Sequence, residues 1–151
     1  MQDLPHAETL ELLRSEPVAH LAVVADGEPY VTPISYVFDS GALSFRTGRG
    51  RRVTAIEANP RVCVEVSIYD TDTGEWKSVV ATGTARLVEE TRHCEAIIAA
   101  LLAKYRSAVA PLSTGARMPM GEEVIVTISL DQISGRSSGS FFTMRTRPGR
   151  L

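Results

Sequence analysis

The chain has 151 residues, of which 44% are hydrophobic and 23% charged, and its formal net charge is −2. This balance is typical of one globular domain, and it excludes a protein whose overall field attracts nucleic acid or an anionic membrane. No apolar run approaches the roughly 18 residues of a membrane span, and the polar first residues carry no signal region. We therefore expect a cytoplasmic protein whose two cysteines, Cys63 and Cys94, are reduced and bind no metal.

The N-terminal segment predicts a helix. Asp3 is placed to cap it, Pro5 lies in its first turn, and Pro17 ends it. Leu10 and Leu13 share one face of this helix, because helical side chains three residues apart point the same way. We expect that face to be buried against the strands that follow.

Two strands joined by a tight turn come next. Residues 18–25 are apolar on both faces, so one face can fill a core while the other must meet a helix or another subunit. Asp26-Gly27 predicts a hairpin turn, and residues 30–38, rich in β-branched and aromatic side chains, predict the second strand. Pro33 lacks the N–H group that a sheet ladder uses, so we expect it at a sheet edge or a bulge.

A basic turn between a strand and a short helix is the most informative stretch of the chain. Residues 43–46 predict the strand, two glycines in residues 47–50 let the backbone turn, and Asn59-Pro60 ends the helix. No acidic residue interrupts the turn or the start of the helix. Four arginines crowd it, namely Arg46, Arg49, Arg51 and Arg52.

Such a turn has the chemistry of a phosphate site. The start of a helix presents free backbone N–H groups and the positive end of the helix dipole, and guanidinium groups bind phosphate oxygens in pairs. The hypothesis from these residues is a site for a small phosphate-bearing ligand. The alternative is a solvated basic loop, and the spacing alone does not separate the two.

The rest of the chain predicts further strands, a long helix and a tail. Residues 61–69 and 76–88 have the pattern of strands, and Gly83 inside the second suggests a bend or bulge. Residues 90–106 have the strongest helical spacing. Residues 124–130 predict a last strand, which we expect to end near Ser134.

Counted together, six short strands joined mostly by tight turns, with two or three helices, favour an antiparallel barrel over a parallel sheet. The fold class is thus mainly β, of the α+β kind. We expect residues 109–121, with their prolines and glycines, to form a loop. Residues 1–138 are expected to be one domain, and residues 139–151 a flexible or interface tail.

Six short motifs occur in an order typical of one family. They are Asp26-Gly-Glu-Pro-Tyr30, Val31-Thr-Pro-Ile-Ser-Tyr-Val37, Leu43-Ser-Phe-Arg46, Gly50-Arg-Arg52, Asn59-Pro-Arg-Val-Cys63 and Ser78-Val-Val-Ala-Thr-Gly83. Through them, most of residues 4–137 resemble the pyridoxamine 5′-phosphate oxidase-like family of flavin-binding proteins. The resemblance implies a six-stranded antiparallel split β-barrel with flanking helices. It also implies a homodimer that holds FMN in a groove between subunits.

The resemblance assigns positions to the cofactor. Arg46 and Thr47 match a strand end that contacts the FMN phosphate and ribityl chain, and Arg51 and Arg52 match a basic pair that holds the phosphate. Ser78 matches a polar residue near the ring or the phosphate. The strand along the isoalloxazine ring is matched by Thr32, Pro33 and Ile34.

Two departures from the family pattern bear on function. Arg52 stands where lysine is usual, which keeps the charge and changes the geometry. The vitamin B6 oxidases of the family carry an Arg-x-His pair near the C-terminus, whereas this chain has Arg145-Thr-Arg147 and no histidine after His93. A vitamin B6 oxidase is therefore not expected.

Two classes of function stay open. The first is an FMN-dependent oxidoreductase acting on a small-molecule substrate, with the deazaflavin F420 as an alternative cofactor. The second is a flavin or haem carrier or sensor without turnover. The sequence contains no metal-ligand spacing and no hydrolytic triad, and it identifies no catalytic residue.

Overall fold

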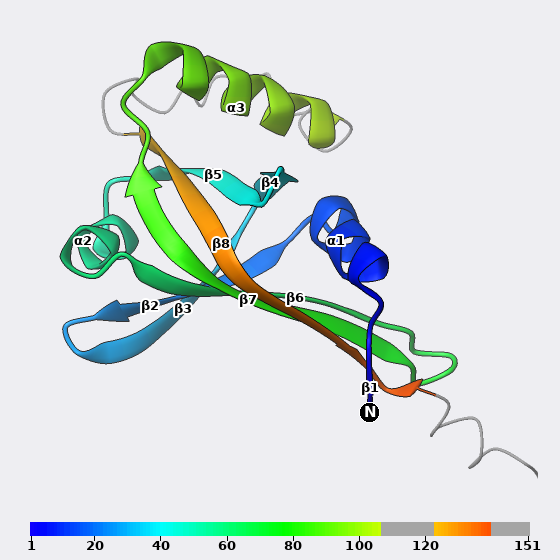
Figure 1. Cartoon of the computed structure of the whole chain (residues 1–151). Helices are drawn as coiled ribbons and strands as arrows, with labels where there is room; N and C mark the ends of the chain where they lie inside the picture. The colour runs from blue at the N-terminus through cyan, green and yellow to red at the C-terminus, as the bar shows by residue number, and fades with distance from the viewer. Residues whose placement is uncertain (107–122, 140–151) are drawn as a thin grey trace, which may run out of the picture.

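The computed structural model of the chain describes residues 1–106 and 123–139. In these residues, eight strands form one antiparallel sheet. They are β1 (Gln2–Asp3), β2 (Ala19–Ala25), β3 (Glu28–Ile34), β4 (Tyr36–Asp39), β5 (Ala42–Gly48), β6 (Arg61–Tyr69), β7 (Trp76–Leu87) and β8 (Glu123–Ser137). Their order across the sheet is β3-β2-β6-β7-β8-β5-β4, and β1 pairs with β8 off this path (Figure 1). The mainly β, antiparallel architecture is confirmed.

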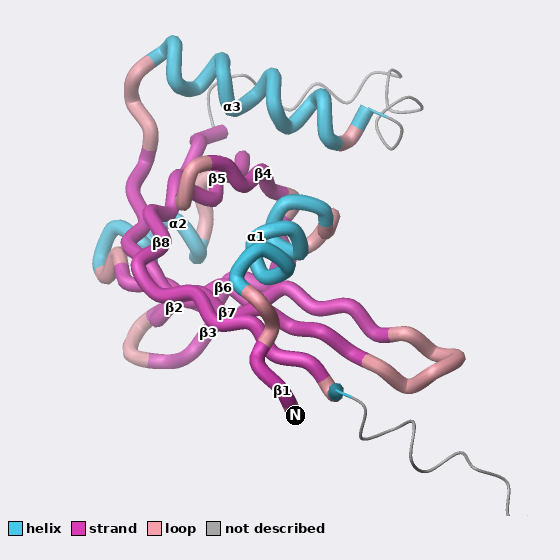
Figure 2. Tube along the Cα trace, turned by 45° about the vertical axis from the view of Figure 1, so that its right-hand side comes forward, coloured by secondary structure: helices cyan, strands magenta, loops and turns pink. Residues whose placement is uncertain are grey.

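The sheet curls into a barrel that hydrogen bonds do not close (Figure 2). β3 and β4 stand at the two ends of the strand order, although they follow each other in the chain and are joined at Ser35. The single strand predicted at residues 30–38 is therefore wrong, because β3 pairs with β2 while β4 pairs with β5. Pro33 lies in an edge strand, as its missing N–H group requires. This division and the short β1 explain why eight strands replace the predicted six.

The inner face of the sheet holds the hydrophobic core. Buried and exposed positions alternate along β2, so that Leu21 is fully buried while the neighbouring His20 is exposed. Removing a side chain such as Leu21 from water stabilises the fold by about 1.5–3 kcal/mol. The two largest side chains that are fully buried are Tyr36 and Phe45, and they come from paired positions of β4 and β5.

Three helices are described, α1 (His6–Ser15), α2 (Arg51–Ala58) and α3 (Thr91–Lys104). α1 and α2 pack on the barrel through Leu13 and Ile56, which are buried in the main core. α3 lies across the end of the barrel near β4, β5 and the start of β8 (Figure 1). It buries Ile97 in a second, smaller cluster with Ile125. No described helix has the length and apolar character needed to span a membrane.

The start of α1 differs from the prediction. Asp3 does not cap the helix, because it lies in β1 opposite Arg136. Pro5 takes the N-cap position instead, without a side-chain hydrogen bond to the helix. Leu13 is fully buried as predicted, whereas Leu10 is only half-buried. The helix therefore docks through a face rotated slightly from the predicted one.

The C-terminal strand is longer than predicted. It does not end near Ser134, because β8 continues to Ser137 in register with β7. β6, β7 and β8 run beyond the barrel as an arm, with β1 beside β8 (Figure 2). The predicted loop at residues 109–121, and residues 140–151 of the predicted tail, lie outside the described residues.

β7 contains the irregularity that Gly83 predicts. The register between β7 and β8 shifts between Thr82 and Gly83. A Cβ atom at Gly83 would lie 2.3 Å from the backbone oxygen of Ser129 in β8. Glycine is therefore required where the two strands approach this closely.

A pair of tyrosines ties α3 to the barrel. The hydroxyl group of Tyr105, which follows α3, accepts the backbone N–H of Tyr36 at 2.9 Å and lies 2.7 Å from the carbonyl oxygen of Pro17. Tyr36 is fully buried, and its own hydroxyl donates to the carbonyl oxygen of Leu13 at 2.7 Å. Burial raises the pKa of Tyr36 well above its ordinary value of 10.0, because the phenolate would lose its hydration.

We expect the protein to lose stability above pH 10, the ordinary pKa of tyrosine. In the unfolded chain Tyr36 ionises near pH 10, whereas in the folded protein it stays protonated to higher pH. The stability that this protonated tyrosine contributes is complete below pH 10 and is lost as pH rises toward the folded-state pKa, by up to about 1.4 kcal/mol per pH unit. Urea unfolding at several pH values should show this slope. Tyr36→Phe should be less stable at pH 8, and above pH 10 its unfolding free energy should fall less steeply with pH than that of the wild type. An unchanged slope would mean that Tyr36 is not the group responsible.

Candidate functional site

The basic turn lies where the barrel is open. β4 pairs with β5 only as far as Phe45, which faces Tyr36. Beyond it, Arg46, Thr47 and Gly48 pair with β8 on one side and with none of the described strands on the other. β3 likewise pairs with β2 and with no other described strand. The turn is therefore placed between two free strand edges.

Arg52 spans this opening. Its Nε donates to the hydroxyl oxygen of Thr32 on β3 at 2.8 Å, and its Nη1 donates to the hydroxyl oxygen of Thr47 on β5 at 3.3 Å. Its Nη2 donates to the carbonyl oxygen of Pro33 at 3.4 Å. Burial lowers the pKa of Arg52, although a guanidinium group stays charged in proteins. Within the described residues no carboxylate lies within ion-pair distance of it.

The other three arginines differ in their partners. Arg51 is exposed, and its guanidinium carbon lies 4.6 Å from the ring centre of Tyr30, a cation–π contact. Arg46 forms an ion pair with Glu123. Arg49 forms one with Glu57, at 3.7 Å between Nη1 and Oε1. In the part of the chain that the structure covers, Arg51 thus resembles Arg52 in having no carboxylate partner.

The first turn of α2 adds backbone donors to the site. Gly50 is the N-cap, with extended backbone and no side-chain hydrogen bond to the helix. The first helical hydrogen bond runs from the N–H of Thr54 to the carbonyl oxygen of Gly50 at 3.1 Å. The N–H groups of Arg51, Arg52 and Val53 therefore lack an acceptor inside the helix. Together with the guanidinium groups of Arg51 and Arg52, which have no carboxylate partner among the described residues, they suit an anion with several oxygens.

The structure brings together some of the predicted site residues and separates others. Arg52 is joined by hydrogen bonds to Thr32, Pro33 and Thr47. Arg51 directly precedes Arg52 and is the first residue of α2. Arg46 instead engages Glu123 across the β5–β8 pair.

Two predicted positions lie apart from this cluster. The side chain of Ile34 is buried in the core, so only its backbone faces the opening. Ser78 lies on β7 opposite Ser67 and Arg136, with β6 and β2 between β7 and β3. Among the described residues, no hydrogen bond joins Ser78 to Arg51 or Arg52.

Sequence reasoning missed Tyr30 and Glu123. Tyr30 lies two residues before Thr32 on β3, so both side chains are on the same face of the strand. This two-residue spacing from Thr32 could have identified Tyr30 as a site residue. Glu123 meets the turn only through strand pairing with Gly48, which no local pattern reveals.

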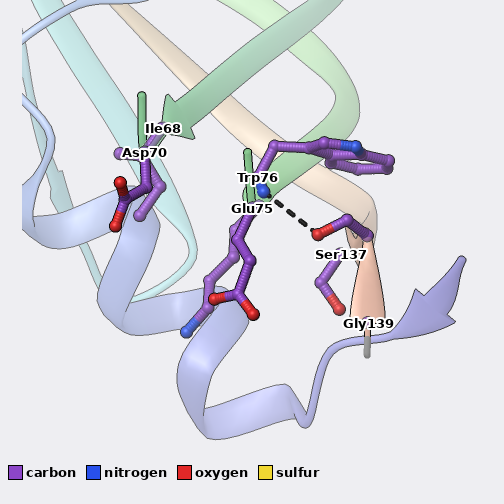
Figure 3. Close-up of a pocket in the computed structure, with 8 residues that line it drawn as sticks. Ile68, Asp70, Glu75, Trp76, Ser137 and Gly139 are labelled. Atoms are coloured by element: carbon purple, nitrogen blue, oxygen red, sulfur yellow. Dashed lines mark hydrogen bonds between the residues drawn. The ribbon is translucent and has the colours of Figure 1, made fainter. Parts of the chain in front are cut away.

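A separate pocket of about 290 Å³ lies at the end of the arm (Figure 3). Its lining includes the carboxylates of Asp70 and Glu75, the amine of Lys77, and Trp76. Asp70 accepts the backbone N–H groups of Thr73 and Asp72, which hold its pKa below the ordinary value. The two carboxylates of the pocket outnumber its one amine, which itself pairs with Glu8, so this pocket suits a phosphate less well than the basic turn, and the basic turn is the candidate site.

Comparisons with known proteins agree on one family. The family model described as pyridoxamine 5′-phosphate oxidase matches residues 5–137. An uncharacterised protein of Rhizobium meliloti is 28% identical over 131 residues, which cover 80% of this chain and 84% of that protein.

Two solved structures are similar over nearly the whole chain. A FAD-binding protein of Mesorhizobium loti has a TM-score of 0.76 and 26% identity, and the match covers 91% of this chain and 98% of that one. A FAD-binding protein of Mycobacterium smegmatis has a TM-score of 0.61 and 25% identity, covering 90% and 98%. The chain therefore belongs to the pyridoxamine 5′-phosphate oxidase family and has the split-barrel fold of its flavin-binding members.

Proposed function

We propose that this protein binds a flavin, FMN, at the basic turn between β5 and α2, and that it is an oxidoreductase acting on a small molecule. The observation that carries the proposal is Arg52, a partly buried cation held between β3 and β5 beside an uncapped helix start. A phosphate supplies a negative charge for the guanidinium group and acceptor oxygens for the N–H groups at the helix start. The flavin-binding relatives from Mesorhizobium loti and Mycobacterium smegmatis support a flavin as the bearer of that phosphate.

The residues fit such a group. Arg51, Arg52 and the free N–H groups of the first turn of α2 would hold the phosphate. The hydroxyl groups of Thr32 and Thr47 fix the orientation of the Arg52 guanidinium. The free edge of β3, including Pro33, would orient the ring. A bound flavin supplies hydride and electron transfer, while the chain supplies binding, orientation and exclusion of water.

The absorption spectrum of the purified protein is the first test. A flavin spectrum supports the proposal, whereas a deazaflavin spectrum favours an F420-dependent reductase and a haem spectrum favours a haem carrier or sensor. Oxidation of NADH or NADPH with candidate acceptors then separates an enzyme from a carrier. Protein that binds none of these groups after incubation with each would contradict the proposal.

We also propose that the protein is a homodimer. The outward face of the sheet exposes Val24, Val31 and Val80 on β2, β3 and β7, with 42%, 58% and 43% of their surface accessible. An exposed apolar face of this kind usually marks an interface, and closed two-fold symmetry is the commonest way to cover it. A second copy on this face would bring its Ser78 toward the flavin of the first. Cofactor binding and dimerisation are then linked.

Dilution of the FMN-loaded protein should therefore release FMN as the dimer dissociates. Free-flavin fluorescence should rise in step with the loss of dimer seen by light scattering. Val31→Lys, which places a charge on the outward face, should give a monomer with weakened FMN binding. Leu102→Lys is the matched control, because Leu102 is similarly exposed (55%) but lies on α3. A monomer that retains FMN at full affinity would rule out a shared site.

A further inference from the structure

We propose that Glu57 and Glu123 make the phosphate site selective for a flavin with a single terminal phosphate, so that FMN binds more tightly than FAD. The proposal rests on the flavin function proposed above and assigns selectivity to two residues that the family resemblance does not name. The four arginines of the turn differ in whether a carboxylate accompanies them. Arg46 and Arg49 are paired with Glu123 and Glu57, whereas Arg51 and Arg52 have no carboxylate partner among the described residues.

In this proposal a first phosphate binds at Arg51 and Arg52, the two arginines of the turn without a carboxylate partner in the described part of the chain. Arg52 is fixed by three hydrogen bonds, and Arg51 precedes it in the same turn of α2. A phosphate monoester has a second pKa of about 6, so it carries close to two negative charges at pH 7. Two guanidinium groups and three backbone N–H groups match that charge and its terminal oxygens. The terminal phosphate of FMN is such a monoester.

FAD offers a different anion to the same groups. Its first phosphorus carries one ester bond and one anhydride bond and has one negative charge. A second phosphate, also with one negative charge, follows across the anhydride oxygen. The remaining cations of the turn are Arg46 and Arg49. Each is accompanied by a carboxylate, so attraction of the second phosphate to the arginine is offset by repulsion from the glutamate.

The two glutamates should contribute unequally. The side chain of Glu123 is 19% exposed, whereas that of Glu57 is 53% exposed. Water and salt screen an exposed charge strongly and a buried one weakly. Repulsion of a second phosphate should therefore come mainly from Glu123. A purely structural role for these pairs would instead change stability and leave the choice of flavin unaffected.

The test is a titration of the folded, flavin-free protein with FMN, FAD and riboflavin. For the wild type we expect FMN to bind about tenfold or more tightly than FAD. Glu123→Gln should lower the ratio of the FAD to the FMN dissociation constant severalfold, because it strengthens FAD binding. Glu57→Gln should lower the same ratio by a smaller factor. Glu8→Gln is the matched control, since it removes another exposed ion pair, at 3.0 Å from Lys77, on α1. It should leave the ratio unchanged.

The outcomes separate this proposal from the one on which it rests. If the wild type binds FAD as tightly as FMN, or if both glutamine variants keep the wild-type ratio, the selectivity assignment is wrong while flavin binding stands. If neither flavin binds, both proposals fail. Thermal unfolding of each variant checks its folding. Should Glu123→Gln fold poorly, Glu57→Gln still tests the proposal, because it should change the ratio in the same direction by a smaller factor.

Discussion

Reversing the charge of Arg51 and Arg52 together should abolish FMN binding while leaving the sheet folded. Each charge-assisted hydrogen-bonding contact with the phosphate is worth about 1.5–3 kcal/mol, so losing both weakens binding roughly a hundredfold to ten-thousandfold. The introduced carboxylates add repulsion. Fluorescence titration with FMN measures the effect. Riboflavin, which lacks the phosphate, should bind the wild type and the double variant with similar, weak affinity.

Two further variants make this result interpretable. Arg51→Glu alone keeps the three hydrogen bonds by which Arg52 joins β3 and β5, so it tests the charge without disturbing the opening of the barrel. Arg86→Glu reverses an exposed arginine on β7 and should leave FMN affinity unchanged. Wild-type FMN affinity in the folded double variant would mean that the phosphate binds elsewhere.

Gly83→Ala should destabilise the protein by about 3 kcal/mol or prevent folding. The added methyl group would lie 2.3 Å from the backbone oxygen of Ser129 and 2.9 Å from Cγ2 of Ile128. A backbone atom of a central strand cannot move aside as a flexible side chain can, so β7 and β8 would have to separate. Chemical denaturation measures the loss.

Gly48→Ala is the control for this substitution. Gly48 also lies in the sheet, but a Cβ atom there meets nothing within 4 Å. This variant should be close to the wild type in stability. If Gly83→Ala is as stable as the wild type, β7 and β8 can separate at the bulge without loss of unfolding free energy. The close approach of the two strands would then not constrain the fold.

The parts of the fold that depend on local pattern could be predicted from the sequence. Alternation along β2 and β6, the Asp26-Gly27 turn and the bulge at Gly83 all follow from side-chain period or backbone freedom. The break at Ser35 could not, because residues on both sides have the composition of a strand. It arises from the change of partner from β2 to β5, which is a property of the assembled sheet.

The same division holds for the candidate site. The clustering of Arg51, Arg52 and Thr47 is local, so a turn rich in glycine and arginine predicts it. Thr32 and Pro33 entered only through a family resemblance, because β3 meets the turn through tertiary packing. The capture of Arg46 by Glu123 depends on the β5–β8 pairing of distant segments. A sequence shows how many charges a turn carries, but not which of them are already neutralised.

The central place of β8 has a consequence for the nascent chain. Without β8, the described sheet falls into two pieces, β3-β2-β6-β7 and β5-β4, and β1 loses the strand with which it pairs. On the ribosome β8 is made after every other described strand, so the β4–β5 hairpin waits unpaired on one edge until residues 123–137 emerge. Contacts between such distant segments form slowly, and exposed strand edges are prone to aggregation meanwhile. The turn that carries Arg51 and Arg52 is thus synthesised early, but the strand that anchors it arrives late.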